Sequence, residues 1–418
     1  MTAQPAQHAR TQVGIVGAGP AGLMLSHLLS AAGIGSVVIE TRTREDIEAT
    51  IRAGILEQGT VDLMVSTGVG DRLLDKGSRH DGIEIRFGGG SHRVDFRSSV
   101  GRSVYLYPQH EVLRDLIAAR LADDGDIRFG ASEVSLHGVT GTEPVIHFTD
   151  ADGRPTDLRC DLIAGCDGAQ GTTKWSIPDG RRTDHFRAYR HGWFGILAEA
   201  PPSSKELIYA HSDRGFALIS SRTPTVQRMY FQCDPEEDAD SWSDNRIWDE
   251  LQSRVAGRGF SLNEGRIFQR SVIPMRSYIC DPMQHGRLFL AGDAAHTVPP
   301  TGAKGLNLAI SDAVVLAQAL ERFFGTGHAD LLEGYGRTAA QRVWRAQHFS
   351  WWMTSMLHLA PDAGDFDRHR QLAELDQITG SAAGRTLLAE SYTGWPIELT
   401  NPRSVVAEAL SLTHGRWP

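Results

Sequence analysis

The sequence predicts an α/β fold, in which a Rossmann-like dinucleotide-binding domain is interrupted by an antiparallel sheet and followed by a helical C-terminal region. Three features predict it: a glycine-rich turn directly after an apolar run near the N-terminus, short alternating apolar runs after residue 183, and aromatic stretches of helical character after residue 345. Alternation with a period of two is typical of strands with one buried face. Glycine makes up 44 of the 418 residues, which exceeds its usual share of about 7%.

The first expected element is a buried strand that runs into the turn Gly17-Ala18-Gly19-Pro20-Ala21-Gly22 and then into a helix. Gly17 makes the turn, Gly19 lets the backbone approach a pyrophosphate, and Gly22 lets the helix pack against the strand. A second strand over residues 36–39 ends in Glu40, whose carboxylate is placed to accept hydrogen bonds from a ribose. The spacing therefore predicts a dinucleotide site at the N-terminus of the helix.

Two later segments repeat the pattern of a strand that delivers a carboxylate. In residues 161–171 an apolar strand leads to Asp167 and Gly168, and in residues 286–296 another leads to Asp293. A glycine-rich loop then opens a helix expected over residues 306–324, whose N-terminus favours an anion or a ring oxygen. The glycine turn alone leaves open whether the ligand is a nicotinamide dinucleotide or FAD.

Composition disfavours several classes of protein. The formal net charge of −9 disfavours nucleic acid as a partner, since a phosphate backbone calls for clustered positive charge. Four cysteines in so long a chain indicate a reducing cytoplasm rather than a disulfide framework. Residues 11–39 carry no charged side chain, and this uncharged segment is long enough for a membrane span. Six glycines and Pro20 interrupt the run, so we expect a soluble protein without a signal peptide or membrane contact.

Together these segments resemble the flavoprotein aromatic hydroxylases, whose three FAD motifs occur in the same order. Further similar stretches are residues 52–59, 206–210, 214–218, 283–296 and 349–355, and the resemblance covers roughly residues 11–397. It implies an FAD-binding domain of the glutathione-reductase type in two parts, residues 1–182 and 276–345. It also implies a substrate-binding antiparallel sheet over residues 183–275, and a helical region over residues 346–418 that contacts a second copy in a homodimer.

The resemblance also implies an activity. NADH or NADPH reduces FAD, and one atom of O2 is transferred to the ring of a phenolic acid beside its hydroxyl group. The substrate-region stretches are most similar to members that convert 4-hydroxybenzoate to 3,4-dihydroxybenzoate. Two alternatives remain open: a hydroxylase of another phenolic acid, and an FAD-fold protein that binds without catalysis. No metal ion is expected.

The candidate substrate residues are expected on adjacent strands of the antiparallel sheet. The planar fork of Arg222 suits a carboxylate, and the resemblance implies that Ser220, Arg222 and Tyr230 bind the substrate carboxylate. A free phenol has a pKa near 10 and must lose its proton before hydroxylation. The resemblance implies that Tyr209 contacts the phenol oxygen and relays this proton through Tyr392 and water to His80 near the surface.

The flavin is expected on the other side of the substrate. The resemblance implies that the Pro300 carbonyl polarises the substrate oxygen, that the backbone of residues 301–307 lies beside the flavin ring, and that Arg228 takes part in flavin movement. The other FAD contacts that it implies are Arg52, Gln109, Asp293, Thr301, Lys304, Gly305, Leu306 and Asn307.

The segment after Glu40 departs from family members that prefer NADPH. Asp46 stands where those enzymes tend to carry a tyrosine, and Thr50 where they tend to carry an arginine. Glu45 and Asp46 would repel the extra phosphate of NADPH, while Arg42 and Arg44 would attract it. The balance favours a protein that uses NADH at least as well, although these charges also fit a solvated helix face. Further on, apolar residues recur with helical spacing in the tail, which predicts one short helix over residues 405–412.

Overall fold

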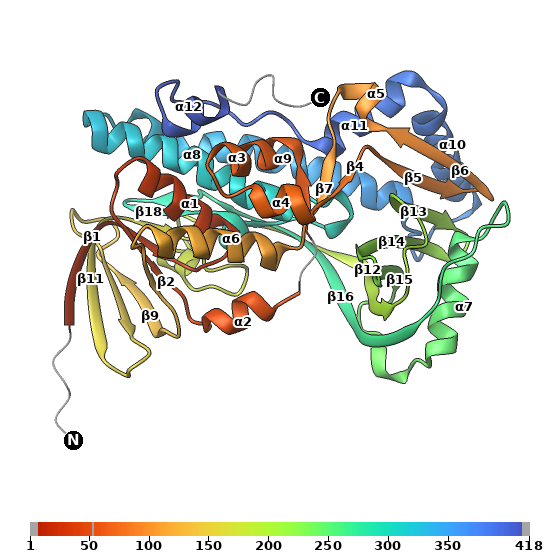
Figure 1. Ribbon diagram of the computed structural model, residues 1–418, viewed down its shortest axis with the longest axis horizontal. Coiled ribbons are helices and arrows are strands. Elements are labelled where there is room, and N and C mark those ends of the chain that lie inside the picture. Colours follow the sequence, from red (N-terminus) through yellow and green to blue (C-terminus); the bar gives the residue numbers. More distant parts are fainter. Residues whose placement is uncertain (1–6, 52–53, 412–418) are drawn as a thin grey trace.

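The structure, a computed structural model, describes residues 7–51 and 54–411. Two eight-stranded sheets and one three-stranded sheet organise these residues. In Figure 1 the first sheet lies on the left beneath α1 and α8, and the second lies on the right beside α7.

The first sheet forms the core of the dinucleotide-binding part. Its main path runs β17-β18-β11-β1-β2-β8, with β10 and β9 added at β11, and its central pairs are parallel. Val16 and Leu290 both lie opposite Gly165, so the three predicted motifs leave the sheet at one edge. The strands are β1 (Gln7–Val16), β2 (Ser36–Ile39), β8 (Asp126–Arg128), β9 (Ser132–His137), β10 (Val145–Thr149), β11 (Pro155–Gly165), β17 (Gln284–His285) and β18 (Leu288–Leu290).

Helices cover this sheet and share its core. Pro20 begins α1 directly after Gly19, a position where the missing N–H of proline has no cost. Leu23, Leu25 and Leu29 are buried in α1, which packs against α6 and α8. The helices of this part are α1 (Pro20–Ala31), α2 (Arg44–Ala49), α3 (Gln58–Ser66), α4 (Asp71–Lys76), α6 (Gln109–Ala122) and α8 (Gly305–Thr326).

The second sheet runs β19-β16-β12-β15-β14-β13-β5-β6 and is antiparallel except at β13–β5. Its alternation sends Ile208, Ile219 and Met229 to one face, where they pack with residues of α7 (Asp244–Val255), and Tyr209 and Tyr230 to the other. The strands are β5 (Gly82–Phe87), β6 (Gly90–Asp95), β12 (Thr183–Glu199), β13 (Leu207–Ser212), β14 (Gly215–Thr223), β15 (Val226–Cys233), β16 (Arg266–Asp281) and β19 (His296–Thr297).

The antiparallel sheet expected over residues 183–275 is thus present, but it recruits more of the chain. β5 and β6 join it from an earlier segment, and β16 continues to Asp281. The domain boundaries given above stay a prediction. The predicted fold class is confirmed.

The remaining helices belong to the C-terminal part, except for one short helix over residues 96–100 that packs against it, and a small sheet completes the fold. The helices are α5 (Phe96–Val100), α9 (Asp330–Leu357), α10 (Asp365–Gly380), α11 (Ala382–Thr393) and α12 (Val405–Ser411), and the three-stranded sheet contains β3 (Ile55–Glu57), β7 (Val104–Leu106) and β4 (Ser78–His80). α12 confirms the predicted tail helix, and its Val406 and Leu410 enter the core of the dinucleotide-binding part. Leu412 lies outside the described residues.

The uncharged run of residues 11–39 forms part of β1, then α1 and β2, not one continuous span. Over residues 7–51 and 54–411, every helix is too short or too polar to cross a bilayer.

Candidate active site

A cavity of about 590 Å³ opens at the sheet edge where the three motifs meet. Seven of the predicted cofactor residues line it: Gly17, Gly19, Glu40, Gln109, Asp293, Gly305 and Leu306. Arg42, Arg276 and the segment 166–170 also line it. Arg276 is absent from the predictions because a single arginine within strand β16 carries no motif.

The glycines of the first motif shape the wall of this cavity. Gly17 has a φ of +108°, and a Cβ there would lie 2.3 Å from the Cys166 carbonyl oxygen. A Cβ on Gly22 would lie 2.0 Å from the Gly17 oxygen, so only glycine lets α1 approach the turn this closely. A Cβ on Gly19 would meet nothing closer than the Cys166 carbonyl oxygen at 3.9 Å, apart from its chain neighbours. That space faces the cavity, where the pyrophosphate of a dinucleotide would lie against the N-terminus of α1.

Glu40 is held in place at the end of β2. Its Oε2 accepts a hydrogen bond from the Ala18 amide at 2.7 Å, and its Oε1 accepts one from the Arg42 amide at 2.9 Å. The side chain is buried yet lines the cavity. A rigid carboxylate in this place fits the ribose contact that the spacing predicted.

Three side chains of the predicted flavin loop point into the protein. The Lys304 ammonium donates to Glu57 Oε1 at 2.6 Å and to the Tyr392 carbonyl at 3.0 Å. Asn307 Oδ1 accepts from the Glu57 amide, and Thr301 Oγ1 accepts from the Thr354 hydroxyl. Burial lowers the pKa of Lys304, and the Glu57 carboxylate opposes that change. These side chains fix the loop, so its backbone is what remains available to a flavin.

The strand register brings the predicted substrate residues to one face of the second sheet. Tyr209 on β13 pairs with Leu218 on β14, which pairs in turn with Tyr230 on β15. Ser220 follows two residues after Leu218 and therefore shares this face. The Tyr209 and Tyr392 hydroxyl oxygens lie 2.7 Å apart, and both rings are buried. Burial raises the pKa of both phenols, so the pair is uncharged at neutral pH.

Two guanidinium groups on β14 and β15 flank the same face. Neither Arg222 nor Arg228 has a carboxylate partner within residues 7–51 and 54–411, and Arg222 interacts with the Tyr230 hydroxyl. Arg228 is buried, its Nε lacks a hydrogen-bond acceptor among those residues, and its guanidinium lies 5.0 Å from the centre of the Tyr230 ring. Burial lowers the pKa of Arg222, and the charge of Arg228 lowers it further. Two such cations without an anion favour a negatively charged ligand between them.

Three other predicted residues differ from expectation or lie apart. His80 was expected near the surface, but it is only 3% exposed because the pairing of β4 with β7 turns its ring inward. Its Nδ1 has no partner among the described residues, and burial lowers its pKa. The Pro300 carbonyl accepts the Ala303 amide at 3.0 Å, which leaves a second lone pair for a ligand. Arg52 lies outside the described residues.

Comparison with known proteins decides the family. A family model described as an FAD binding domain matches residues 10–350. The chain is 43% identical to p-hydroxybenzoate hydroxylase of Acinetobacter baylyi over 395 residues, which cover 94% of this chain and 97% of that enzyme. The chain belongs to the flavoprotein aromatic hydroxylases. The predicted resemblance is thereby confirmed.

Solved structures of flavoprotein aromatic hydroxylases share the fold. The chain superposes on p-nitrophenol 4-monooxygenase from Pseudomonas putida with a TM-score of 0.79 at 19% identity, covering 93% of this chain and 99% of that one. It superposes on an anhydrotetracycline hydroxylase from Streptomyces rimosus with a TM-score of 0.69 at 23% identity, covering 92% and 76%. The protein is an FAD-dependent monooxygenase that takes hydride from NADH or NADPH and acts with O2 on a small aromatic molecule.

Proposed function

We propose that the substrate is 4-hydroxybenzoate and that the product is 3,4-dihydroxybenzoate. The observation that carries this proposal is that one face of the sheet holds two guanidinium groups, without a carboxylate partner among the described residues, together with a buried pair of tyrosine hydroxyls. The cations suit a carboxylate, and the tyrosine pair suits a phenol. An aromatic acid that carries both groups would engage both parts of the face. The 43% identical relative is itself a p-hydroxybenzoate hydroxylase.

Each residue then has a proposed role at one end of the substrate. Arg222 and Tyr230 bind the carboxylate, and Arg228 adds positive charge beside them. The Ser220 hydroxyl donates to the Arg228 carbonyl at 2.9 Å, so it must rotate to join them. Tyr209 accepts the phenol proton and passes one to Tyr392, and the orphaned Nδ1 of His80 is the acceptor beyond it, reached through water. The Pro300 carbonyl contacts the phenol oxygen from the other side.

The cofactor residues have proposed roles as well. Gly17, Gly19 and Gly22 admit the pyrophosphate of FAD, and Glu40 binds its ribose. The other proposed contacts are Arg52, Gln109, Asp293 and the loop of Thr301, Lys304, Gly305, Leu306 and Asn307, with Arg228 beside the moving flavin. When bound, FAD carries electrons from NADH or NADPH to O2 and supplies the oxygen atom, while the protein orients the substrate and excludes water.

Substrate-stimulated oxidation of NADH or NADPH tests the proposed substrate. We expect 4-hydroxybenzoate to accelerate the oxidation more than benzoate, which lacks the phenol, or phenol, which lacks the carboxylate. A faster rate with another phenolic acid would favour the alternative substrate class. A yellow protein that no phenolic acid accelerates would favour an FAD-fold protein that binds without catalysis.

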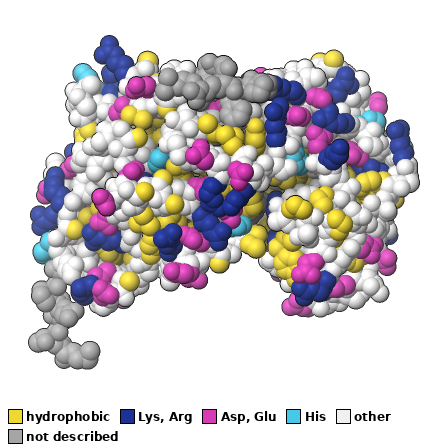
Figure 2. All heavy atoms as spheres, viewed as in Figure 1, with side chains coloured by type: hydrophobic (Ala, Val, Ile, Leu, Met, Phe, Trp, Pro, Cys, Tyr) yellow, Lys and Arg dark blue, Asp and Glu magenta, His cyan; other side chains and the backbone are white. Residues whose placement is uncertain are grey.

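For the hydride donor we propose that NADH is used at least as well as NADPH. Arg44 is paired with Glu48 at 2.6 Å, and Arg42 lies 3.4 Å from Glu40. Both cations are thus partly neutralised, while Glu45 and Asp46 are exposed at the start of α2. In Figure 2 the surface is hollowed between the lobe of α2 and the lobe of α7, with basic side chains nearby, where a donor could dock transiently.

Rates of flavin reduction measured under nitrogen with each donor, in the presence of 4-hydroxybenzoate, test this preference. We expect the NADH rate to equal or exceed the NADPH rate, because the carboxylates of α2 repel the 2′-phosphate of NADPH. Replacing Glu45 and Asp46 by Gln and Asn should raise the relative rate with NADPH. A strong preference of the unaltered protein for NADPH would contradict the proposal.

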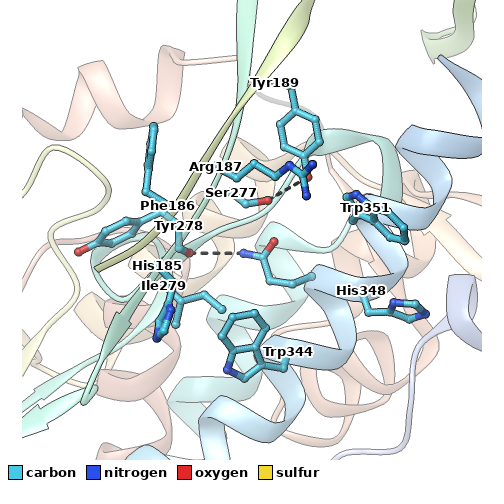
Figure 3. Close-up of a pocket in the computed structure, with 11 residues that line it drawn as sticks. His185, Phe186, Arg187, Tyr189, Ser277, Tyr278, Ile279, Trp344, His348 and Trp351 are labelled. Carbon is cyan, nitrogen blue, oxygen red and sulfur yellow. Dashed lines mark hydrogen bonds between the residues drawn. The ribbon is translucent and has the colours of Figure 1, made fainter. Parts of the chain in front are cut away.

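We also propose a homodimer, for which an aromatic patch on α9, β12 and β16 gives support. A pocket of about 390 Å³ there is surrounded by Phe186, Trp344 and Trp351, which Figure 3 shows around its rim. Their side chains are 64%, 50% and 40% exposed, and clustered exposed aromatic rings are typical of protein interfaces. A monomeric mass in sedimentation equilibrium at micromolar concentration would contradict the homodimer. A cytoplasmic location stays a prediction.

A further inference from the structure

A buried histidine–aspartate pair lies close to the elements that line the cofactor cavity, outside the residues discussed so far. His296 Nε2 lies 2.6 Å from Asp312 Oδ2, and their side chains are 1% and 3% exposed. Taking two charges out of water is costly, and a pair of this kind contributes stability only where its geometry is good and its other polar atoms are satisfied. The segments that this pair connects therefore indicate its role.

The same carboxylate also holds the turn that carries Asp293. Asp312 Oδ2 accepts a hydrogen bond from the Gly292 amide at 2.8 Å. Gly292 has a φ of +63° and begins the 3-10 turn Gly292–Ala294, from which Asp293 reaches the cavity. Asp312 itself lies on α8, two turns after Gly305, which also lines the cavity. One carboxylate thus connects the two elements that enclose this side of the cavity.

His296 fixes the other end of the turn. It lies on β19, where it pairs with Ile279 of β16, and the turn is closed by the Ala295 amide donating to the Gly292 carbonyl at 2.9 Å. The Asp312 carboxylate raises the pKa of His296 against the effect of burial. One carboxylate oxygen thus contacts both the Gly292 amide and the His296 ring, and both ends of the turn are tied to one point on α8.

We propose that His296 and Asp312 are positioning residues for FAD. They fix the Gly292–Ala294 turn against α8, so that Asp293 and the first residues of α8 face the cofactor together. Replacing the Asp312 carboxylate by a neutral group removes the charge that the Gly292 amide and His296 Nε2 both contact. The effect is expected in the affinity for FAD itself. The proposal rests on the family's use of FAD and is independent of which phenol is hydroxylated.

The test is the dissociation constant of FAD for the apoprotein, measured by quenching of flavin fluorescence. Asp312→Asn should weaken FAD binding roughly 10- to 100-fold, the cost of losing a hydrogen-bonded charge. His296→Gln keeps a donor at the Nε2 position without the charge, and it should weaken binding less. Glu321→Gln is the matched control: Glu321 also lies on α8 and accepts a backbone amide, that of Val405, but it holds α12.

The control should lower the melting temperature of the apoprotein and leave its FAD affinity unchanged. An Asp312→Asn protein that binds FAD within twofold of the unaltered protein would overturn the proposal. It would also be overturned if all three variants lost affinity in proportion to their lost stability, since that is the signature of a merely structural pair. If the Asp312→Asn apoprotein does not fold, unchanged FAD affinity in His296→Gln would overturn it, and weakened affinity would support it. Hydroxylation of a different phenol leaves all of these outcomes unaffected.

Discussion

Tyr209→Phe is expected to lower the rate of hydroxylation by roughly two orders of magnitude, the usual contribution of a positioned proton-transfer group, and to leave substrate affinity nearly unchanged. The Tyr209 hydroxyl is the partner of the Tyr392 hydroxyl at 2.7 Å, and both rings are buried in the same hydrophobic cluster. Without the Tyr209 hydroxyl, the substrate phenol has no group to accept its proton. Phenylalanine fills nearly the same volume, so the sheet should keep its packing.

Two measurements separate these effects. Substrate affinity follows from the change in flavin absorbance on titration with 4-hydroxybenzoate, and the rate follows from product formation. Tyr189→Phe is the matched control, since the Tyr189 hydroxyl contacts Ser277 Oγ and takes no part in the Tyr209–Tyr392 contact. An unchanged rate of product formation in Tyr209→Phe would remove Tyr209 from the proposed relay.

Arg222→Gln is expected to weaken binding of 4-hydroxybenzoate by about 2–5 kcal/mol, the cost of truncating one partner of a desolvated charge pair. The guanidinium has no carboxylate partner among the described residues, so the substrate carboxylate is proposed to be its counterion. Arg228 remains nearby and keeps part of the attraction, but the carboxylate loses its bidentate contact with the Arg222 guanidinium.

Comparing the affinities for 4-hydroxybenzoate and for its amide, 4-hydroxybenzamide, tests the role of Arg222 more specifically than the affinity for the acid alone. The unaltered protein should bind 4-hydroxybenzoate far more tightly than 4-hydroxybenzamide, whereas Arg222→Gln should bind the two almost equally. Arg214→Gln is the control, because Arg214 lies near the same sheet but is paired with Glu250. If Arg222→Gln kept the discrimination between acid and amide, the carboxylate would have to bind elsewhere.

Local spacing predicted the cofactor side of the site well. The glycine turn, Glu40 and Asp293 each depend on a strand, a turn and a helix that are close in sequence, and the structure brings them to one cavity. Resemblance to a family supplied the candidate substrate residues, and the strand register shows that Tyr209, Ser220 and Tyr230 share a face.

Most of the features that the sequence did not predict depend on pairing between segments far apart in the chain. The parallel pairing of β5 with β13 joins segments more than 100 residues apart, and no local pattern encodes such a partner. The inward side of His80 depends on the pairing of β4 with β7. The contact of Lys304 with Glu57, and that of His296 with Asp312, are apparent only once α8 is packed.

The proposed function is tested most directly by the stoichiometry of the reaction. Purified holoprotein is supplied with 4-hydroxybenzoate, O2 and NADH or NADPH, and both the donor consumed and the aromatic product are quantified by chromatography. We predict close to one 3,4-dihydroxybenzoate per NADH or NADPH oxidised. Oxidation of the donor with hydrogen peroxide and no hydroxylated 4-hydroxybenzoate would contradict this function.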